Sequence, residues 1–369
     1  MNSQKIQIKE YKSASITGKS TRKNTKSIVR ASKVNSELKV NFLKLSTAMV
    51  KANTTIGKSI PSQAYDIILS ALMLHSLLDY KKPEIYLKDG FRQKYRDFSR
   101  SARTGELAQA INYIFAQEKL GFKFVFDYDE FLKVYSIPYK KLGGTPDYVL
   151  FGKKSKNLAV LESKGSSTKE KLTKPQLRAK LQGAMDNQCM PGVLHLKSAG
   201  KQKVSNSYAS VVELVESSES RRSTIHFADP EYDEFKHETY SEAISNYYFR
   251  WILFICRFSL PYYLSAKEAI DILLNGIGID IGIDIGIYLH LDIVTHEGID
   301  FYVQKSPLSE SYLKIPVRYG ISKKVIELLY AGDYEALYAL DFPAISLSGV
   351  EIFSDGTIAL EVQTNDSKR

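Results

Sequence analysis

A stretch of 22 residues, Gly143–Lys164, constrains the fold of this chain most, because it sets charged residues around two short apolar runs. Tyr148–Phe151 and Leu158–Leu161 are the runs, and a polar turn separates them. Short apolar runs bounded by such a turn are typical of a β-hairpin. Asp147 precedes the first run and Glu162 follows the second. The hairpin therefore predicts that the two acids lie close together.

The acids on this hairpin have the chemistry of a metal site. Side chains alternate along a strand, so Glu162 and Lys164 project from one side while Leu161 and Ser163 project from the other. Two neighbouring carboxylates repel each other unless a cation or a proton lies between them. Carboxylate oxygens suit Mg²⁺. We therefore expect Asp147 and Glu162 to be metal ligands, with Lys164 orienting and helping to deprotonate an attacking water.

The pair Pro146-Asp147, followed by Glu162-Ser163-Lys164, resembles the motif of the PD-(D/E)XK nuclease superfamily. The resemblance covers roughly residues 100–230, about a third of the chain, and the motif itself is short and degenerate. It implies an α/β fold, namely a restriction-endonuclease-like core with a mixed central sheet flanked by helices. It also implies Mg²⁺-dependent hydrolysis of phosphodiester bonds, with Mn²⁺ as a possible substitute cofactor.

The family commonly places a glutamate on the helix before the first catalytic strand, and Glu106 matches that place. Apolar residues recur at helical spacing after it, Thr104 can serve as N-cap, and Gly121 ends the pattern. By resemblance, Glu106 is a third catalytic residue, either as a supporting metal ligand or as a base.

The residues after Lys164 are basic and rich in Ser and Thr, and we expect a flexible loop followed by a helix over Pro175–Asn187. In the family this segment often lies along the nucleic-acid backbone. The resemblance therefore implies phosphate contacts, which position a substrate without reading its sequence. The alternative interpretation is an ordinary solvated surface. The candidate nucleic-acid-binding residues are Lys169, Lys171, Lys174, Arg178 and Lys180. Val193–Leu196 and Ser210–Val215 are two further predicted strands.

The positive charge of the chain is concentrated at its N-terminal end. Residues 1–58 hold 13 Lys and Arg and two Glu, so their net charge is +11. The whole chain has a net charge of +10, so the remaining residues sum to −1. We expect residues 1–58 to be a basic, partly flexible arm that becomes helical near Val34–Lys51. Such an arm raises the affinity for any polyanion. A solubilising tail or a contact with an acidic protein are the alternatives.

Cysteine and hydropathy patterns indicate the compartment. Cys189 and Cys256 are the only cysteines, too few for a disulfide framework or a thiolate site, so a cytoplasmic location is expected. The most apolar stretch, Tyr247–Leu264, contains two arginines and a proline, which argues for a buried helix and against a membrane partner.

The rest of the chain divides at an acidic, polar stretch near residue 230. We expect a core with a helical cap over 59–230, with a helix at Ser62–Tyr80, and an α+β accessory domain over 231–369 for target recognition or oligomerisation. The repeat over Ile277–Ile287 predicts a strand with isoleucines on one face. Its Asp280 and Asp284 stand ~13 Å apart on a strand and cannot share an ion.

Three functions follow from these patterns. The first is a Mg²⁺-dependent endonuclease acting on DNA, with RNA not excluded. We favour a restriction or defence enzyme, because a compact nuclease core with a large unrelated companion domain is common among them. The second is a nucleic-acid-binding module without catalysis. The third is a nuclease-fold subunit of a homodimer or larger assembly. An intact Asp147, Glu162 and Lys164 favour the first.

Overall fold

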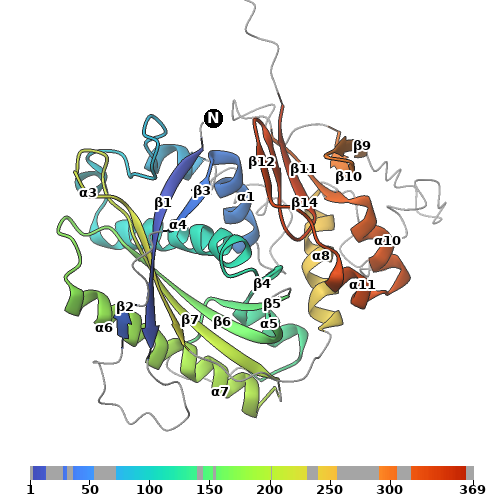
Figure 1. The fold of residues 1–369 in the computed structure, drawn as a ribbon, viewed down its shortest axis with the longest axis horizontal. Helices are drawn as coiled ribbons and strands as arrows, with labels where there is room; N and C mark the ends of the chain where they lie inside the picture. Colours follow the sequence, from blue (N-terminus) through green and yellow to red (C-terminus); the bar gives the residue numbers. More distant parts are fainter. Residues whose placement is uncertain are drawn as a thin grey trace, which may run out of the picture. The chain divides into compact units, whose positions relative to one another are not determined.

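The protein is described by a computed structural model that covers residues 3–13, 28–30, 36–53, 72–138, 144–152, 155–200, 202–230, 240–255, 291–305 and 317–362. The chain forms two compact units (Figure 1). Unit 1 comprises Met1–Thr55 and Tyr65–Glu238, and unit 2 comprises Ile56–Ala64 and Thr239–Arg369. Among the described residues, each unit is built around its own sheet, so each is considered by itself below.

Unit 1 contains an eight-stranded mixed sheet in the order β2-β1-β8-β7-β6-β5-β4, with β3 also paired to β1. The pairs β6–β7 and β1–β8 are parallel, and the other pairs are antiparallel. The strands are β1 Gln4–Ser13, β2 Ile28–Arg30, β3 Ser36–Val40, β4 Phe124–Asp127, β5 Tyr148–Gly152, β6 Ser155–Ser166, β7 Val204–Glu213 and β8 Thr224–Pro230. The predicted hairpin of β5 and β6 is therefore confirmed.

Helices cover both faces of this sheet (Figure 1). They are α1 Phe42–Asn53, α3 Phe91–Lys94, α4 Asp97–Glu118, α5 Tyr128–Val134, α6 Lys174–Ala184, the π-helix η1 Met185–Cys189 and α7 Met190–Ser198. On α4, Asn112 donates to the Ser163 hydroxyl on β6 at 2.6 Å. On η1, Gln188 is hydrogen-bonded to Glu162, the neighbour of Ser163. Because neighbouring side chains on a strand point to opposite faces, α4 and η1 cover opposite faces of β6.

The prediction of a flexible N-terminal arm was wrong over Gln4–Ser13, whereas its helical part is confirmed in part by α1. Gln4–Ser13 forms the strand β1, which pairs with β8 in parallel and with β2 and β3 antiparallel. Ile6 and Ile8 are buried, whereas Lys5, directly before Ile6, is exposed and pairs with Glu37 at 3.2 Å. The basic residues therefore occupy the outer positions of an alternating strand, and this alternation was masked by the composition.

Two other local predictions were also wrong. The helix carrying Glu106 does not begin at Thr104, because α4 begins two turns earlier, and the Thr104 hydroxyl donates to the Arg100 carbonyl at 2.6 Å. Val193–Leu196 lies in the helix α7 and not in a strand. This run continues the helix that begins at α6, and a short apolar run alone does not distinguish a strand from a buried helix segment.

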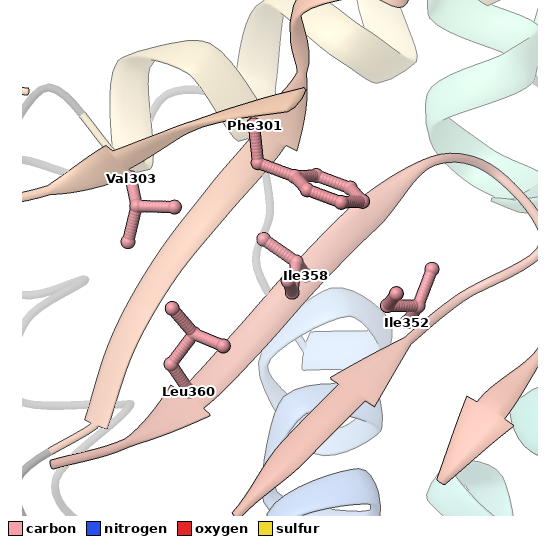
Figure 2. Packing of buried hydrophobic residues seen from close by; sticks show 5 residues of the cluster. All are labelled: Phe301, Val303, Ile352, Ile358 and Leu360. Atoms are coloured by element: carbon pink, nitrogen blue, oxygen red, sulfur yellow. The ribbon is translucent and has the colours of Figure 1, made fainter. Parts of the chain in front are cut away.

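Unit 2 is built around a six-stranded antiparallel sheet in the order β12-β13-β14-β11-β10-β9. Its elements are α8 Ser241–Ile255, β9 Leu291–His296, β10 Ile299–Gln304, β11 Val317–Ser322, α10 Lys323–Ala331, α11 Tyr334–Ala339, β12 Ile345–Leu347, β13 Val350–Ile352 and β14 Thr357–Glu361. Buried side chains from three strands gather on one face of the sheet (Figure 2); they are Phe301, Val303, Ile352, Ile358 and Leu360. α10 directly follows β11, and β13 and β14 form an antiparallel hairpin.

The fold is thus mixed α/β, with a curled mixed sheet flanked by helices and a second, antiparallel sheet. The predicted strand Ile277–Ile287 lies outside the described residues, as does most of the predicted helix Ser62–Tyr80. None of the helices described combines the length and the apolar character needed to cross a bilayer.

Candidate active site

The strand register brings Asp147 and Glu162 together. Tyr148 on β5 is the antiparallel partner of Leu161 on β6. Asp147 directly precedes Tyr148 and Glu162 directly follows Leu161, so the two acids come to the same level of the hairpin. The Asp147 backbone carbonyl also accepts from the Tyr128 amide at 3.0 Å, which fixes the chain where it enters β5.

Asp147 is held in place through both of its carboxylate oxygens. Oδ1 accepts from the Gln109 side-chain amide on α4 at 2.8 Å, and Oδ2 accepts from the Ser163 backbone N–H at 2.7 Å. Burial raises the pKa of Asp147, and these two hydrogen bonds and the charge of Lys164 offset part of that rise. The carboxylate therefore has fixed bonds that set its orientation relative to β6.

Glu162 is buried and only partly compensated. Glu162 is only 1% exposed, and its Oε1 lies 2.6 Å from the Lys164 ammonium. Burial and the neighbouring Asp147 raise the pKa of Glu162 to about 8, although Lys164 and a Gln188 hydrogen bond act in the opposite direction. Its Oε2 has no hydrogen-bond partner among the described residues. An unsatisfied buried carboxylate oxygen is costly, so a cation or a proton is expected there.

The arrangement fits a divalent cation, with two residues to hold it. Asp147 and Glu162 would supply hard oxygen ligands, and the unpaired Oε2 is an available coordinating atom. The Lys164 side chain is 39% exposed, so its ammonium lies on the outer side of the buried Glu162. Among the described residues, no group of three or more His, Cys, Asp and Glu side chains could hold a metal ion. The protein therefore offers two carboxylates and leaves any remaining ligand positions to other donors.

Glu106, the expected third ligand, is not brought into contact with this pair among the interactions that the structure describes. Its side chain is exposed on α4, and partial burial raises its pKa while Arg103 lowers it. Gln109, three residues further along the helix, is the residue that contacts Asp147. Three residues are less than one helical turn, so Glu106 points about 60° away from Gln109.

Polar residues on α4 that sequence reasoning missed connect the helix to the site. Asn112 is fully buried; its amide donates to the Ser163 hydroxyl, and its carbonyl accepts from the Ser210 hydroxyl on β7 at 2.7 Å. Together with Gln109 it forms a polar row at i, i+3 spacing within the mostly buried, apolar second half of the helix. Two amides at this spacing within a run of buried apolar residues were the available signal, because a buried amide needs a partner.

The π-helix η1 lies against Glu162 from the other face. Gln188 and Cys189 both belong to it, and the Cys189 thiol donates to the Tyr208 carbonyl at 3.3 Å. A side chain at Gly144 would lie 2.9 Å from Cγ of Gln188, so only glycine allows the loop before Asp147 to approach this closely. Such π-helical turns are often found at functional sites, where they redirect one side chain.

The loop after Lys164 is clamped, which contradicts the expectation that it is flexible. The Arg92 guanidinium donates to the Ser167 carbonyl at 2.5 Å, and Arg221 donates to the carbonyls of Thr168 and Lys169. Glu219 pairs with Arg92 at 2.6 Å and with Arg221 at 2.7 Å. The proposed phosphate-binding residues lie on this loop and on the helix α6 that follows it. Lys169, Lys171, Lys174 and Lys180 are exposed, and Arg178 is partly buried.

The predicted helix after this loop begins at α6 and carries the expected proline in its first turn. A capping box between Thr173 and Gln176, which sequence reasoning did not identify, fixes its start. The helix continues through η1 into α7, so it is longer than predicted and passes directly behind Glu162.

Two carboxylates, one ammonium and a row of amides therefore lie at the entry of β5 and on β6, where they could hold a cation and orient a water molecule. The strongest single feature is the buried Glu162, which has one unpaired oxygen and a raised pKa. Comparison of the chain with protein-family models, curated proteins and solved structures finds no match.

Proposed function

We propose that this chain is a Mg²⁺-dependent endonuclease of the PD-(D/E)XK type that hydrolyses phosphodiester bonds in DNA. The observation that carries the proposal is the meeting of Asp147, Glu162 and Lys164 on one hairpin, with one Glu162 oxygen unpaired. A restriction-endonuclease-like core agrees with the mixed sheet and the helices on both of its faces.

In the proposed mechanism, each residue has a defined task. Asp147 and Glu162 hold the cation, and Gln109 and the Ser163 amide keep Asp147 oriented toward it. The cation, when bound, lowers the pKa of a bound water and neutralises charge that gathers on the scissile phosphate. The ammonium of Lys164 is partly exposed beside the buried Glu162. There it orients the attacking water and stabilises the negative charge that develops on the phosphate.

Substrate positioning falls to the exposed basic residues beyond the site. Lys169, Lys171 and Lys174 lie on or beside the clamped loop that follows Lys164. A clamp that fixes this backbone also fixes where their ammonium groups can meet phosphates. Phosphate contacts of this type give affinity and register without reading sequence. A restriction or defence nuclease, with unit 2 serving target recognition or self-association, is the setting that we favour.

The test is cleavage of supercoiled plasmid DNA with Mg²⁺, with Mn²⁺ and with EDTA. Asp147→Ala and Lys164→Ala are each expected to reduce the rate at least a hundred-fold, because each removes part of the charge arrangement at the reacting phosphate. Lys324→Ala is the matched control, since Lys324 also pairs with a glutamate but on unit 2. Wild-type rates in both site variants would refute the catalytic assignment.

An inactive wild type would leave the second interpretation, a nucleic-acid-binding module without catalysis. Binding of the same DNA in EDTA separates the two. Under this alternative, the wild type and Lys164→Ala both bind DNA, and neither cleaves it with any divalent cation.

A further inference from the structure

A second feature of unit 1, not used in the proposed mechanism, is a basic and aromatic surface where α3 leads into α4. Residues 92–103 contain five Lys and Arg and a single acid, and two aromatic residues that are not buried lie among them. We call this the α3–α4 surface; its basic members are Lys94, Arg96, Arg100 and Arg103. Arg92 is not a member, because it is nearly buried and pairs with Glu216 and Glu219. Four cations against Asp97 give a net charge of about +3, which makes a polyanion the complementary partner.

Phe98 is the unusual residue of this surface. It is 87% exposed, more than any other large hydrophobic side chain among the described residues. Its neighbours one turn further along α4 are Ser101 and Ala102, which are too short to cover the ring. Both faces of the ring are therefore available.

Cationic residues flank Phe98 in the sequence, and two of them contact the ring of the neighbouring Tyr95. Arg100 pairs with Asp97, directly before Phe98. Arg103 lies over the Tyr95 ring with its guanidinium carbon 5.0 Å from the ring centroid, and Lys94 lies 5.4 Å from the same ring. An apolar partner or a second copy of this surface would have to bury these charges, whereas a nucleic acid neutralises them. The charge pattern thus selects a nucleic acid as the occupant.

The helix also relates this surface to the candidate site. Phe98 and Gln109 are 11 residues apart on α4, so they lie about 16 Å apart along the axis and point within about 20° of each other. Gln109 contacts Asp147. Between them, a side chain added at Gly105 would have nothing within 4 Å, so the helix surface is open there. A strand leaving the site along α4 would reach Phe98 after about five nucleotides at 3.4 Å each.

We propose that Phe98 stacks on an unpaired base of single-stranded DNA, with the cations of the α3–α4 surface holding the adjacent phosphates. This inference rests on the proposed function, because it places the substrate strand of the same site. An exposed aromatic ring among cations is the usual platform for single strands, since every base has a face to stack. Bases of an intact duplex already stack on each other, so the ring discriminates in favour of unpaired DNA.

The experiment measures binding of a fluorescein-labelled 15-nucleotide DNA, and of its duplex, by anisotropy in EDTA at one fixed salt concentration. Phe98→Ala is expected to weaken single-strand binding about ten-fold, which is within the range for loss of one stacked base. Phe98→Trp is expected to restore it, and duplex binding is expected to change less than two-fold. Leu194→Ala is the matched control, because Leu194 is also exposed, at 60%, and lies on α7.

The outcomes separate this inference from the proposed function. Unchanged single-strand binding in Phe98→Ala, or an equal loss for duplex, overturns the stacking role even if Asp147-dependent cleavage is found. A selective loss with rescue by tryptophan supports the stacking role even if the wild type cleaves no DNA. Far-UV circular dichroism of each variant checks that the fold is retained.

Discussion

Replacing Glu162 by glutamine should stabilise the metal-free protein, although it removes a charge from an ion pair. The fold raises the pKa of this carboxyl group from 4.5 to about 8, mainly by burial. For an acid with a raised pKa, the stability is complete below the unfolded-state value and is lost as pH rises toward the folded-state value. At pH 7 the carboxyl group therefore destabilises the fold by roughly 3 kcal/mol, and at pH 5 by roughly 1 kcal/mol.

The assay is guanidinium unfolding followed by far-UV circular dichroism at pH 5 and pH 7, in EDTA and in Mg²⁺. In EDTA at pH 7, Glu162→Gln is expected to unfold at higher denaturant concentration than wild type, and the gap is expected to narrow at pH 5. Mg²⁺ at about 100 times its dissociation constant adds about 2.7 kcal/mol to the free energy of unfolding of the wild type and little to that of the variant. The difference in stability between the two proteins should therefore nearly disappear.

Glu219→Gln is the matched control. It makes the same change of charge, but the pKa of Glu219 is lowered by its bonds to Arg221 and Arg92, so its loss should destabilise the protein. Equal destabilisation by both variants, at both pH values and regardless of Mg²⁺, would refute the reasoning that Glu162 is an uncompensated acid awaiting a cation.

Two further predictions concern packing and acid stability. Gly165→Ala should lower the free energy of unfolding by at least about 1 kcal/mol, because its Cβ would lie 2.4 Å from the Thr104 carbonyl oxygen. Gly105→Ala has open space around it and should raise that free energy by roughly 0.5–1 kcal/mol. A denaturant titration that ranks the two variants the other way would contradict the close approach of α4 and β6. Burial lowers the pKa of His226 below 6.5, so its contribution is complete above pH 6.5 and is lost as pH falls, with a slope of at most about 1.4 kcal/mol per pH unit. His226→Gln should flatten the decline of stability between pH 6.5 and 4.5, and an unchanged slope would show that other groups, such as Glu213, determine it.

The sequence was sufficient for the local geometry of the hairpin. Alternation along a strand predicted that Glu162 and Lys164 share a side, and they form an ion pair at 2.6 Å. The apolar runs predicted β5 and β6, and the turn between them predicted that Asp147 and Glu162 meet. These relations depend on residues within about twenty positions of each other, where strand period and turn chemistry decide the outcome.

Relations between distant segments were missed. Gln109 contacts Asp147 only because α4 packs over the hairpin. The hydrophobic pattern of a helix and that of a strand predict each element, but they do not predict how the two elements pack against each other. Glu106 was chosen by resemblance to a motif, but the α4 residue that contacts Asp147 is Gln109. Gln188 depends on the π-helical turn of η1, for which no sequence pattern is reliable.

The pairing of β1 has a consequence for biosynthesis. Gln7 is aligned with Thr224 in the parallel β1–β8 ladder, so β1 leaves the ribosome more than two hundred residues before the strand that becomes this neighbour. Until then, the described strands that can protect one of its edges are the nearby β2 and β3. Assembly of this sheet is therefore expected to be slow and to wait until β8 has been synthesised, and the nascent chain is expected to depend on chaperones that shield an open strand.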